Sequence, residues 1–401
     1  MNFKKYNLIL IFIFLSFFLQ TNLFAQVKDY NKQWKQVEEL TKKGLTKSAL
    51  DVTLKIYETA KKDNNDPQII KALLYRITLG RNLEENTNVK SVALVEKEIQ
   101  SSKQPAASIL NSILAEMYWN FLQQNRYKFY NRTQTAPIAI GVKKDDILTW
   151  GLEDLHKKIG ELYLSSIKEE KLLQQTKLDP FDSIIIKGNV RYLRPTLYDL
   201  LAHRALDYFK NDERDIAKPA YAFELKDEKA FAPAKEFSSY KFINKDSSSL
   251  HYHALTIYQQ LLRFHKDDTK PDALIDADIE RVNFVKQYGV MEKKDELYMQ
   301  ALENIVSSNP NNPAVAQASF LHAQEVYTKA SAEDKNAQTK FTIRAAKELL
   351  ENILKKFPQS EGGINAKNLL TQILHKEINI TSEKVNVPGV PFRSLVTYKN
   401  V

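Results

Sequence analysis

Residues 345–374 read AAKELLENILKKFPQSEGGINAKNLLTQIL. Apolar residues recur every three or four positions up to Phe357, which is the spacing of one buried face on an amphipathic helix. An aromatic residue, a proline and a serine at 357–360 then close this helix, and small residues ahead of Leu369 and Ile373 begin a second one. The stretch therefore predicts two antiparallel helices joined by a tight turn.

A second helix pair lies upstream of this one. Tyr298 and Ile305 precede the turn at Ser308-Asn309-Pro310. The following helix is marked by Ala314, Ala318, Leu321 and Val326. Each pair resembles a tetratricopeptide unit, although Pro310 and Pro358 are 48 residues apart and the usual period is about 34. We therefore expect degenerate tetratricopeptide-like repeats over residues 250–376.

Helical periodicity also covers most of residues 26–210. Gly44 predicts a helix stop and Thr46 the start of the next helix, so two helices meet there as a hairpin. Further helices are predicted from Asp66, over 89–100, 106–129 and 145–167, and from Pro195 to about Lys210.

Two stretches interrupt this pattern. Residues 172–193 predict a loop with a short strand at the β-branched run 184–186. Residues 211–249 form a long irregular insertion, which is often functional in a compact protein. Its aromatic residues either plug the helical stack or bind a partner, and they are Tyr221, Phe223, Phe231, Phe237, Tyr240 and Phe242.

The tail, residues 377–401, predicts extended chain that ends in a strand. A single strand does not fold alone, so we expect it either to pair with something outside this chain, as the start of a missing β domain, or to stay loose. The predicted fold is therefore an all-α superhelix of helical hairpins with one irregular insertion and a short extended tail.

Composition agrees with long helices. The 401 residues include only 10 glycines and no cysteine. Few glycines disfavour all-β and doubly wound folds, which use them at tight turns and phosphate loops. The missing cysteine excludes a disulfide scaffold, a thiolate zinc site, an iron-sulfur cluster and a cysteine nucleophile.

The N-terminus predicts export. Lys4 and Lys5 precede the apolar run 8–19, and Ala25 is a small residue at the expected cleavage point. We expect a signal peptide over residues 1–25, cleaved before Gln26, and a protein in the periplasm, the cell envelope or the medium without a transmembrane anchor. The alternative is an uncleaved N-terminal anchor.

Removal of Lys4 and Lys5 leaves 56 of the 58 basic residues against 49 acidic ones, a net charge of +7. Arg126, Tyr127 and Lys128 belong to a basic cluster interleaved with aromatic residues, which is similar to a nucleic-acid surface. Export argues against nucleic acid. The cluster is interpreted either as a solvated helix end or as a contact for anionic envelope polymers or lipids. The remaining members of the cluster are Phe129, Tyr130, Arg132, Lys143 and Lys144.

Few residues suggest chemistry. Asp199, His203 and Asp207 are spaced by four and share one helix face, so they are a weak candidate for a metal site; Arg194 and Arg204 are available to pair with the two acids. His251 and His253 point about 200° apart on a helix.

Known catalytic motifs are absent from the sequence: G-x-S-x-G, a phosphate loop, H-E-x-x-H and a calcium loop. Trp34, Trp119 and Trp150 fall in helical stretches and are interpreted as core. We therefore expect a protein that is not an enzyme and that has no cofactor. The alternative is an exported all-helical hydrolase of glycans or peptidoglycan, which predicts a deep cleft lined by acids.

Several segments together resemble the N-terminal helical region of bacterial alpha-2-macroglobulin family proteins of Bacteroidetes-type bacteria. The segments are YNKQWKQVEELTKKGLTKSAL from Tyr30, DPQIIKALLYR from Asp66, ILAEMYWNFLQQNR from Ile113, RYLRPTLYDLLAHRALDYF from Arg191 and SLVTYKN from Ser394. The resemblance implies an envelope protein whose complete members trap or bind proteases and other proteins through domains further on.

The chain departs from that family where trapping occurs. It lacks the bait region and the macroglobulin sandwiches, and without cysteine it forms no thioester. We expect a non-enzymatic scaffold for envelope proteins, proteases or downstream macroglobulin domains, either as a piece of a longer product or as a stand-alone module. Another reading, an outer-membrane assembly adaptor, expects no β domain after Val401.

Overall fold

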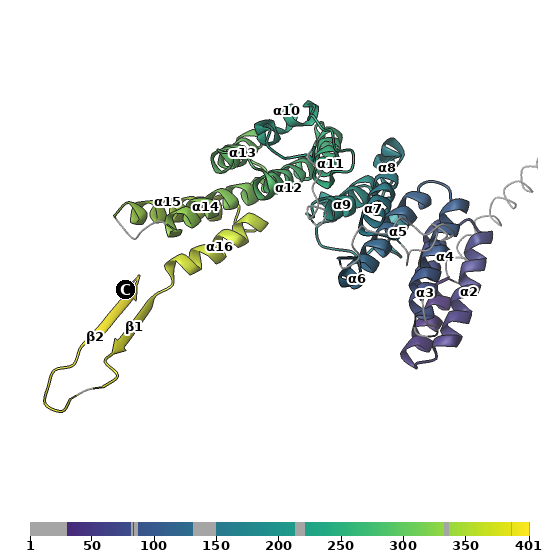
Figure 1. Ribbon diagram of the computed structural model, residues 1–401, viewed down its shortest axis with the longest axis horizontal. Coiled ribbons are helices and arrows are strands. Elements are labelled where there is room, and N and C mark those ends of the chain that lie inside the picture. The colour runs from purple at the N-terminus through teal and green to yellow at the C-terminus, as the bar shows by residue number, and fades with distance from the viewer. Residues whose placement is uncertain are drawn as a thin grey trace, which may run out of the picture. The chain divides into compact units, whose positions relative to one another are not determined.

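The computed structural model describes residues 30–81, 83, 87–130, 150–212, 221–332, 337–385 and 387–400. These residues are mostly helical and include one two-stranded sheet, so the predicted all-α class is confirmed (Figure 1). The predicted signal peptide lies outside the described residues. The chain divides into two compact units, one of Met1–Arg191 with Pro195–Asp207 and one of Tyr192–Arg194 with Tyr208–Val401.

The first unit is a series of short helices that pack mainly on their neighbours in the chain. Contacts join α2 to α3, α3 to α4, α4 to α5 and α5 to α7. After a helix over residues 30–42, the elements are α2 (Thr46–Lys62), α3 (Asp66–Gly80), α4 (Thr87–Ser101), α5 (Ala106–Gln124), α6 (Arg126–Tyr130), α7 (Leu152–Ser166), α8 (Glu170–Gln175) and the 3-10 turn η2 (Asp179–Phe181). Two further elements contain residues of both units, and they are the 3-10 turn η3 (Arg191–Leu193) and the helix α9 (Leu197–Phe209).

Two left-handed residues make the first hairpin turns. Gly44 has φ +72°, and the amide of Leu45 donates to the carbonyl of Leu40 at 2.9 Å. Asn64 has φ +51°, and the amide of Asn65 donates to the carbonyl of Ala60 at 2.9 Å. Both are Schellman motifs, which satisfy the last carbonyls of a helix and reverse the chain. The helix stop predicted at Gly44 is confirmed.

The second unit continues with longer helices. Each helix from α11 to α16 contacts the next one in the chain, and α14 also contacts α16. The elements are η5 (Glu228–Phe231), α10 (Ala234–Ser239), α11 (Leu250–His265), α12 (Asp272–Tyr288), α13 (Lys294–Ser308), α14 (Val315–Ala332), α15 (Ala337–Lys356), α16 (Glu361–Leu374), β1 (Glu377–Ser382) and β2 (Ser394–Lys399).

The pair quoted at the start of the sequence analysis is α15 and α16. Ser360 caps α16 by accepting a hydrogen bond from the amide of Gly363 at 3.0 Å. Leu350 and Ala366 are fully buried in a cluster that α14 completes with Ala316. A Cβ atom at Gly362 would lie 2.1 Å from the carbonyl carbon of Ala316. The backbones of α14 and α16 therefore approach closely because residue 362 has no side chain.

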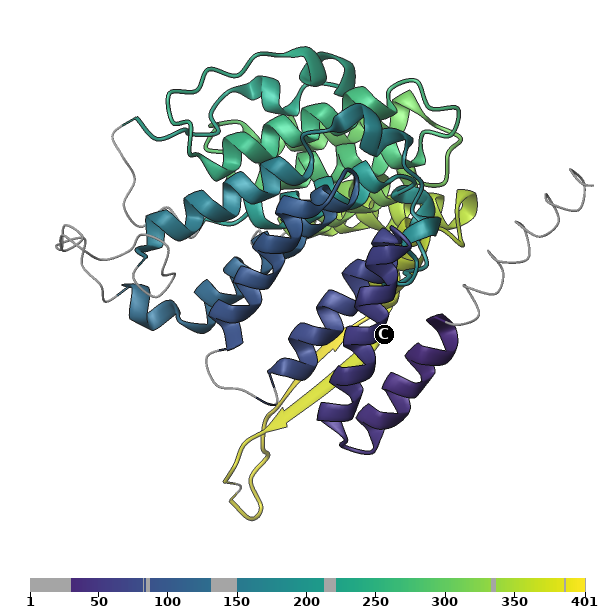
Figure 2. The same ribbon diagram turned by 90° about the vertical axis from the view of Figure 1, so that its right-hand side faces the viewer.

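The tail differs from the prediction. β2 does pair within this chain, because β1 runs antiparallel to it with Ile378 opposite Tyr398 and Ile380 opposite Val396. The expectation of a lone strand was wrong, since the alternation of apolar and polar residues in Glu377–Ser382 is itself a strand pattern. Figure 2 also shows the two strands side by side, projecting from the helices of the second unit.

Three other predictions are corrected. Residues 184–186 form no strand. They follow η2 in a turn, in which the amide of Ile184 donates to the carbonyl of Phe181. A strand needs a partner, and no strand among the described residues pairs with this run. The helix expected over 145–167 is described only from Leu152, and Trp150 lies outside it; residues 131–149 are not among the described residues. The insertion 211–249 contains two short helical segments, η5 and α10.

Among the described helices, none combines the length and the apolar character that a bilayer crossing requires.

Substituting Gly362→Ala tests the close approach of α14 and α16. The added methyl group overlaps the Ala316 backbone, so we expect the free energy of unfolding to fall by about 1 to 3 kcal/mol. Gly80→Ala is the matched control, because nothing lies within 4 Å of a Cβ atom at that helical glycine. Urea unfolding followed by circular dichroism measures both; an equal loss in the two variants would contradict the close approach.

Candidate functional site

Half of the aromatic residues of the insertion are core residues. Phe231, Phe237 and Phe242 are buried, and the rings of Phe237 and Phe242 are 5.7 Å apart. Phe231 lies against Tyr298 of α13 at 6.4 Å. In this position the three rings are inaccessible to a partner and fill space between helices, as the plug interpretation expects.

The other three aromatic residues are accessible to different degrees. Phe223 and Tyr240 are half-buried. The ring of Phe223 packs edge-on against Tyr252 at 5.5 Å, and the Tyr240 hydroxyl donates to Asp227 at 2.6 Å. Tyr221 is exposed. Of the six candidates, Tyr221 is therefore the one with most of its side chain available to a partner.

Side chains of α11 hold the insertion through its backbone carbonyls. The Nε2 amide of Gln259 donates to the carbonyls of Phe237 at 2.8 Å and Tyr240 at 2.7 Å. Arg263 Nη1 donates to the carbonyl of Ser238 at 2.5 Å. Donors on a neighbouring helix thus reach carbonyls at the C-terminal end of α10, where the Phe237 carbonyl also accepts from the amide of Tyr240 at 3.2 Å.

A buried ion pair on α12 completes this attachment. Arg281 is 1% exposed, and its Nε donates to Asp278 Oδ1 at 2.8 Å. Its Nη1 donates to the carbonyl of Ala230, and the guanidinium carbon lies 4.4 Å from the centre of the Phe237 ring. Sequence reasoning missed this pair; opposite charges three residues apart on an apolar helix face were the available signal.

Burial decides the titration of this pair. It raises the pKa of Asp278 above the ordinary value of 3.8, while Arg281 counteracts part of the increase. Both side chains line a cavity of about 60 Å³, together with Phe231, Asn304 and Ser308. Such a volume holds at most about four water molecules, well below the roughly 300 Å³ of a small-molecule pocket. The cavity therefore suits ordered water.

The basic and aromatic segment is partly exposed. Arg126 and Tyr127 are exposed on α6, with Tyr127 at 87%. Phe129 is buried 5.9 Å from the ring of Phe121. The side chains of Lys128 and Tyr130 lie outside the described residues, as do Arg132, Lys143 and Lys144. Within the described part, Arg126 and Tyr127 present the accessible surface.

The candidate metal stripe contains a helix cap. Asp199 is fully buried, and its Oδ2 accepts hydrogen bonds from the amide of Thr196 at 2.9 Å and from its hydroxyl at 2.7 Å. This is a capping box at the start of α9. His203 Nδ1 lies 2.8 Å from the carbonyl oxygen of Asp199. The Asp199 carboxylate is thus committed to the helix start, and Asp207 adds one carboxylate two turns on.

The two arginines considered as partners for this stripe have other contacts. Arg204 donates to Ser112 at 2.8 Å and Glu116 at 2.6 Å on α5. Arg194 donates to Asp276 at 2.5 Å and to Glu280 at 2.8 Å. These four contacts were not predictable from the sequence, because the partners lie more than 80 residues away.

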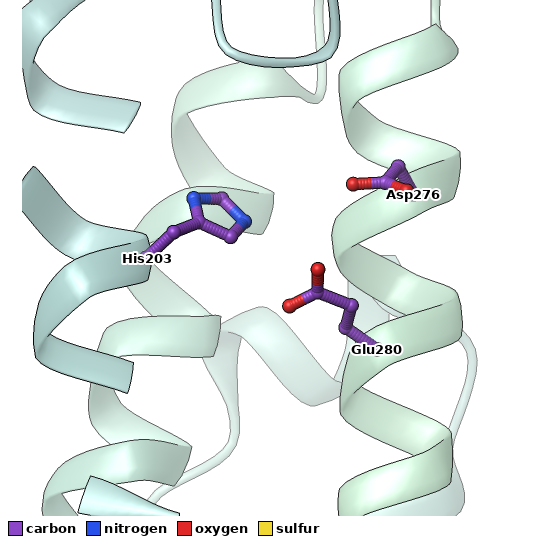
Figure 3. Close-up of side chains that lie close together, drawn as sticks. All are labelled: His203, Asp276 and Glu280. Atoms are coloured by element: carbon purple, nitrogen blue, oxygen red, sulfur yellow. The ribbon is translucent and has the colours of Figure 1, made fainter. Parts of the chain in front are cut away.

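Asp276 and Glu280 lie one turn apart on α12 and extend from the same side of the helix (Figure 3). Both carboxylates bind the single guanidinium of Arg194 in a forked arrangement, which offsets one of their two negative charges. A cation at these two oxygens would have to displace Arg194. His203, also drawn in Figure 3, belongs to the first unit.

His251 and His253 are both on α11, where they point to different sides. The ring of His251 packs against Phe284 at 5.4 Å and Tyr288 at 4.4 Å, and the ring of His253 lies 5.2 Å from Phe209. The helical conformation separates the two imidazoles, so the pair does not share a metal.

Buried carboxylates in the described residues have structural partners. Glu98 accepts hydrogen bonds from Tyr57 and Lys61 at 2.5 Å, which joins α4 to α2. Burial of Tyr57, together with its hydrogen bond to Glu98, raises the pKa of this hydroxyl. Asp246 accepts from the hydroxyl of Ser248 at 2.7 Å. With Asp199 and Asp278, these are the buried acids of the described chain, and all four stabilise local structure.

Removing the buried cation tests its role. Arg281→Met leaves Asp278 buried and unpaired, so we expect the free energy of unfolding at neutral pH to fall by about 3 to 5 kcal/mol. The double variant Asp278→Leu with Arg281→Met removes both charges, and we expect it to recover most of the loss. Arg344→Met is the control, because Arg344 is exposed and pairs with Glu348 only; its change should be within about 0.5 kcal/mol.

The pH dependence follows from the raised pKa of Asp278. The folded Arg281→Met variant binds the Asp278 proton more tightly than its unfolded chain does, so its stability falls as pH rises above about 3.8. The deficit relative to wild type should therefore be larger at neutral pH than at about pH 4.5. Chemical unfolding at both pH values measures this; a deficit independent of pH would indicate lost packing alone.

No known family model matches this chain, and no curated protein resembles it in sequence.

Proposed function

We propose that this protein is an exported, non-enzymatic helical scaffold that binds other proteins of the cell envelope. In this proposal its helix pairs are degenerate tetratricopeptide-like repeats. Its partners are envelope proteins, with proteases or macroglobulin domains as the class that the family resemblance suggests.

One observation carries the proposal. In the second unit each helix from α11 to α16 packs on the next one in the chain. A stack built from nearest-neighbour contacts buries a continuous core and leaves an extended polar surface, which is how helical repeat proteins bind other proteins. The first unit supports the same interpretation, with successive contacts from α2 to α5.

The contacts made by the candidate acidic residues also support a scaffold. Asp199 caps a helix, Asp276 and Glu280 neutralise Arg194, and Asp278 is paired with Arg281. General acid and base catalysis needs carboxylates that reach a substrate, and these groups are engaged in holding helices. The exposed aromatic residues Tyr221 and Tyr127 are the positions we assign to partner contact.

Site-specific photo-crosslinking tests the proposal. A photoreactive phenylalanine analogue replaces Tyr221 or Tyr127 in the native host, and the buried Phe237 is the matched control position. We expect discrete protein adducts from the exposed positions and none from Phe237, because only exposed side chains reach a partner. Identical products from all three positions, or release of soluble fragments from peptidoglycan by the purified protein, would contradict a non-enzymatic scaffold.

Export makes a separate prediction. The charged start, the apolar run 8–19 and Ala25 should direct cleavage before Gln26. Intact mass and N-terminal sequencing of protein recovered from the envelope or medium should therefore identify Gln26 as the first residue. Recovery of a chain that still begins with Met1, in the membrane fraction, would support an uncleaved anchor instead.

A further inference from the structure

The hairpin of β1 and β2 exposes apolar side chains along one face and at its tip. Ile378, Ile380, Val396 and Tyr398 face the same way, since directly opposed residues of an antiparallel pair share a face. Leu395, opposite Thr381, lies on the other face. The four residues that share the first face are all more than half exposed. Described helices of the second unit leave this face uncovered.

The tip is built as an apolar loop. Residues 385–392 read VNVPGVPF and contain no charge. Pro388 and Gly389 form a turn in which the amide of Val390 donates to the carbonyl of Val387 at 3.2 Å, and Gly389 has φ +79°, as a type II turn requires.

The apolar side chains of this tip project into solvent. Val385, Val387, Val390 and Phe392 are between 57% and 81% exposed. They lie on both sides of the turn and follow one another along the loop. A surface that covers the tip therefore meets all four together and no charged group among them.

Basic residues border the tip on both sides. Lys384 precedes it and Arg393 follows it, and the amide of Glu383 donates to the carbonyl of Arg393 at 3.2 Å. The two cations therefore lie at the base of the apolar loop, where Glu383 offsets one of them. This order, an uncharged apolar tip above a basic border, matches the change from acyl chain to anionic headgroup in a lipid leaflet.

We propose that the described residues 384, 385 and 387–393 form a membrane-binding loop that inserts its apolar tip into the surface of an anionic lipid bilayer. Val387, Val390 and Phe392 enter the boundary between headgroups and acyl chains. Lys384 and Arg393 stay among the headgroups, where their charges remain solvated. Charge complementarity decides for lipid over a second copy of this chain, because a second copy would bring the same cations together. The inference is independent of the proposed scaffold function.

A local reporter tests the insertion. In the full chain, Phe392→Trp places an indole at the tip, and Ile243→Trp is the control at another exposed apolar position of the same unit. Vesicles contain phosphatidylcholine with about 30% phosphatidylglycerol, with lipids brominated on the acyl chain as quenchers. We expect a blue shift and quenching for Phe392→Trp and neither for Ile243→Trp. The spectrum of the parent chain, which contains Trp34, Trp119 and Trp150, is subtracted from that of each variant. The difference reports the added indole alone, so attachment through the apolar run 8–19 does not produce it.

Variants at the tip and at its basic border show which side chains vesicle binding depends on. In the Phe392→Trp background, Val387→Asp with Val390→Asp should weaken vesicle binding by at least about tenfold, since two charges would enter the apolar layer. Lys384→Gln with Arg393→Gln should weaken binding and reduce its salt dependence. Circular dichroism should remain unchanged, because all four side chains lie at the surface of the hairpin.

Three results would overturn the proposal. One is the absence of quenching at position 392 with anionic vesicles. Another is equal quenching at positions 392 and 243. A third is a concentration-dependent blue shift of Phe392→Trp without lipid, together with a dimer in sedimentation equilibrium, which would assign the tip to a second copy of this chain.

Discussion

The fold depends on one constraint: each amphipathic helix has a single apolar stripe, which it buries against the neighbours that follow it in the chain. Turns must therefore be tight enough to keep successive helices antiparallel. Gly44 and Asn64 provide this through left-handed backbone conformations, and Ser360 provides it by capping α16 immediately after α15 ends. Where the stack is closest, at Gly362, the absence of a side chain sets the distance between helices.

The insertion is held in place by different interactions, because it has no long amphipathic helix of its own. It adds three aromatic rings to the core and is held by polar side chains that project from α11 and α12 toward its carbonyls. Burying Arg281 is costly, and a hydrophobic pair of similar size would contribute as much stability. The guanidinium of Arg281 binds Asp278, Ala230 and the Phe237 ring together, and all three contacts form in only one position of the insertion. The ion pair therefore contributes to the specificity of that position.

Much of this fold is predictable from local signals. Helical periodicity and the stops at Gly44 and Phe357 locate most helices, because those signals act over a few residues. Non-local pairing is harder to predict. The alternating pattern of Glu377–Ser382 indicates a strand, but it does not show that β2, with Val396 and Tyr398, is its partner. The β-branched run 184–186 favours a strand by composition, but no strand among the described residues pairs with it. The contacts of Arg194 and Arg204 were unpredictable for the same reason.

The terminal hairpin explains how an apolar surface can be both exposed and fixed. Two isolated strands are marginal in water, yet this pair is fastened to the end of α16. Asn400, with φ +56°, donates its amide to the carbonyls of Ile373 at 2.7 Å and His375 at 3.0 Å, and Lys399 donates to Gln372 at 3.2 Å. These donors satisfy last-turn carbonyls of α16 and place a positive charge at the negative end of its dipole. The helix end therefore holds the base of the hairpin, and the uncharged tip extends away from it, where burial of its valines requires a surface other than α16.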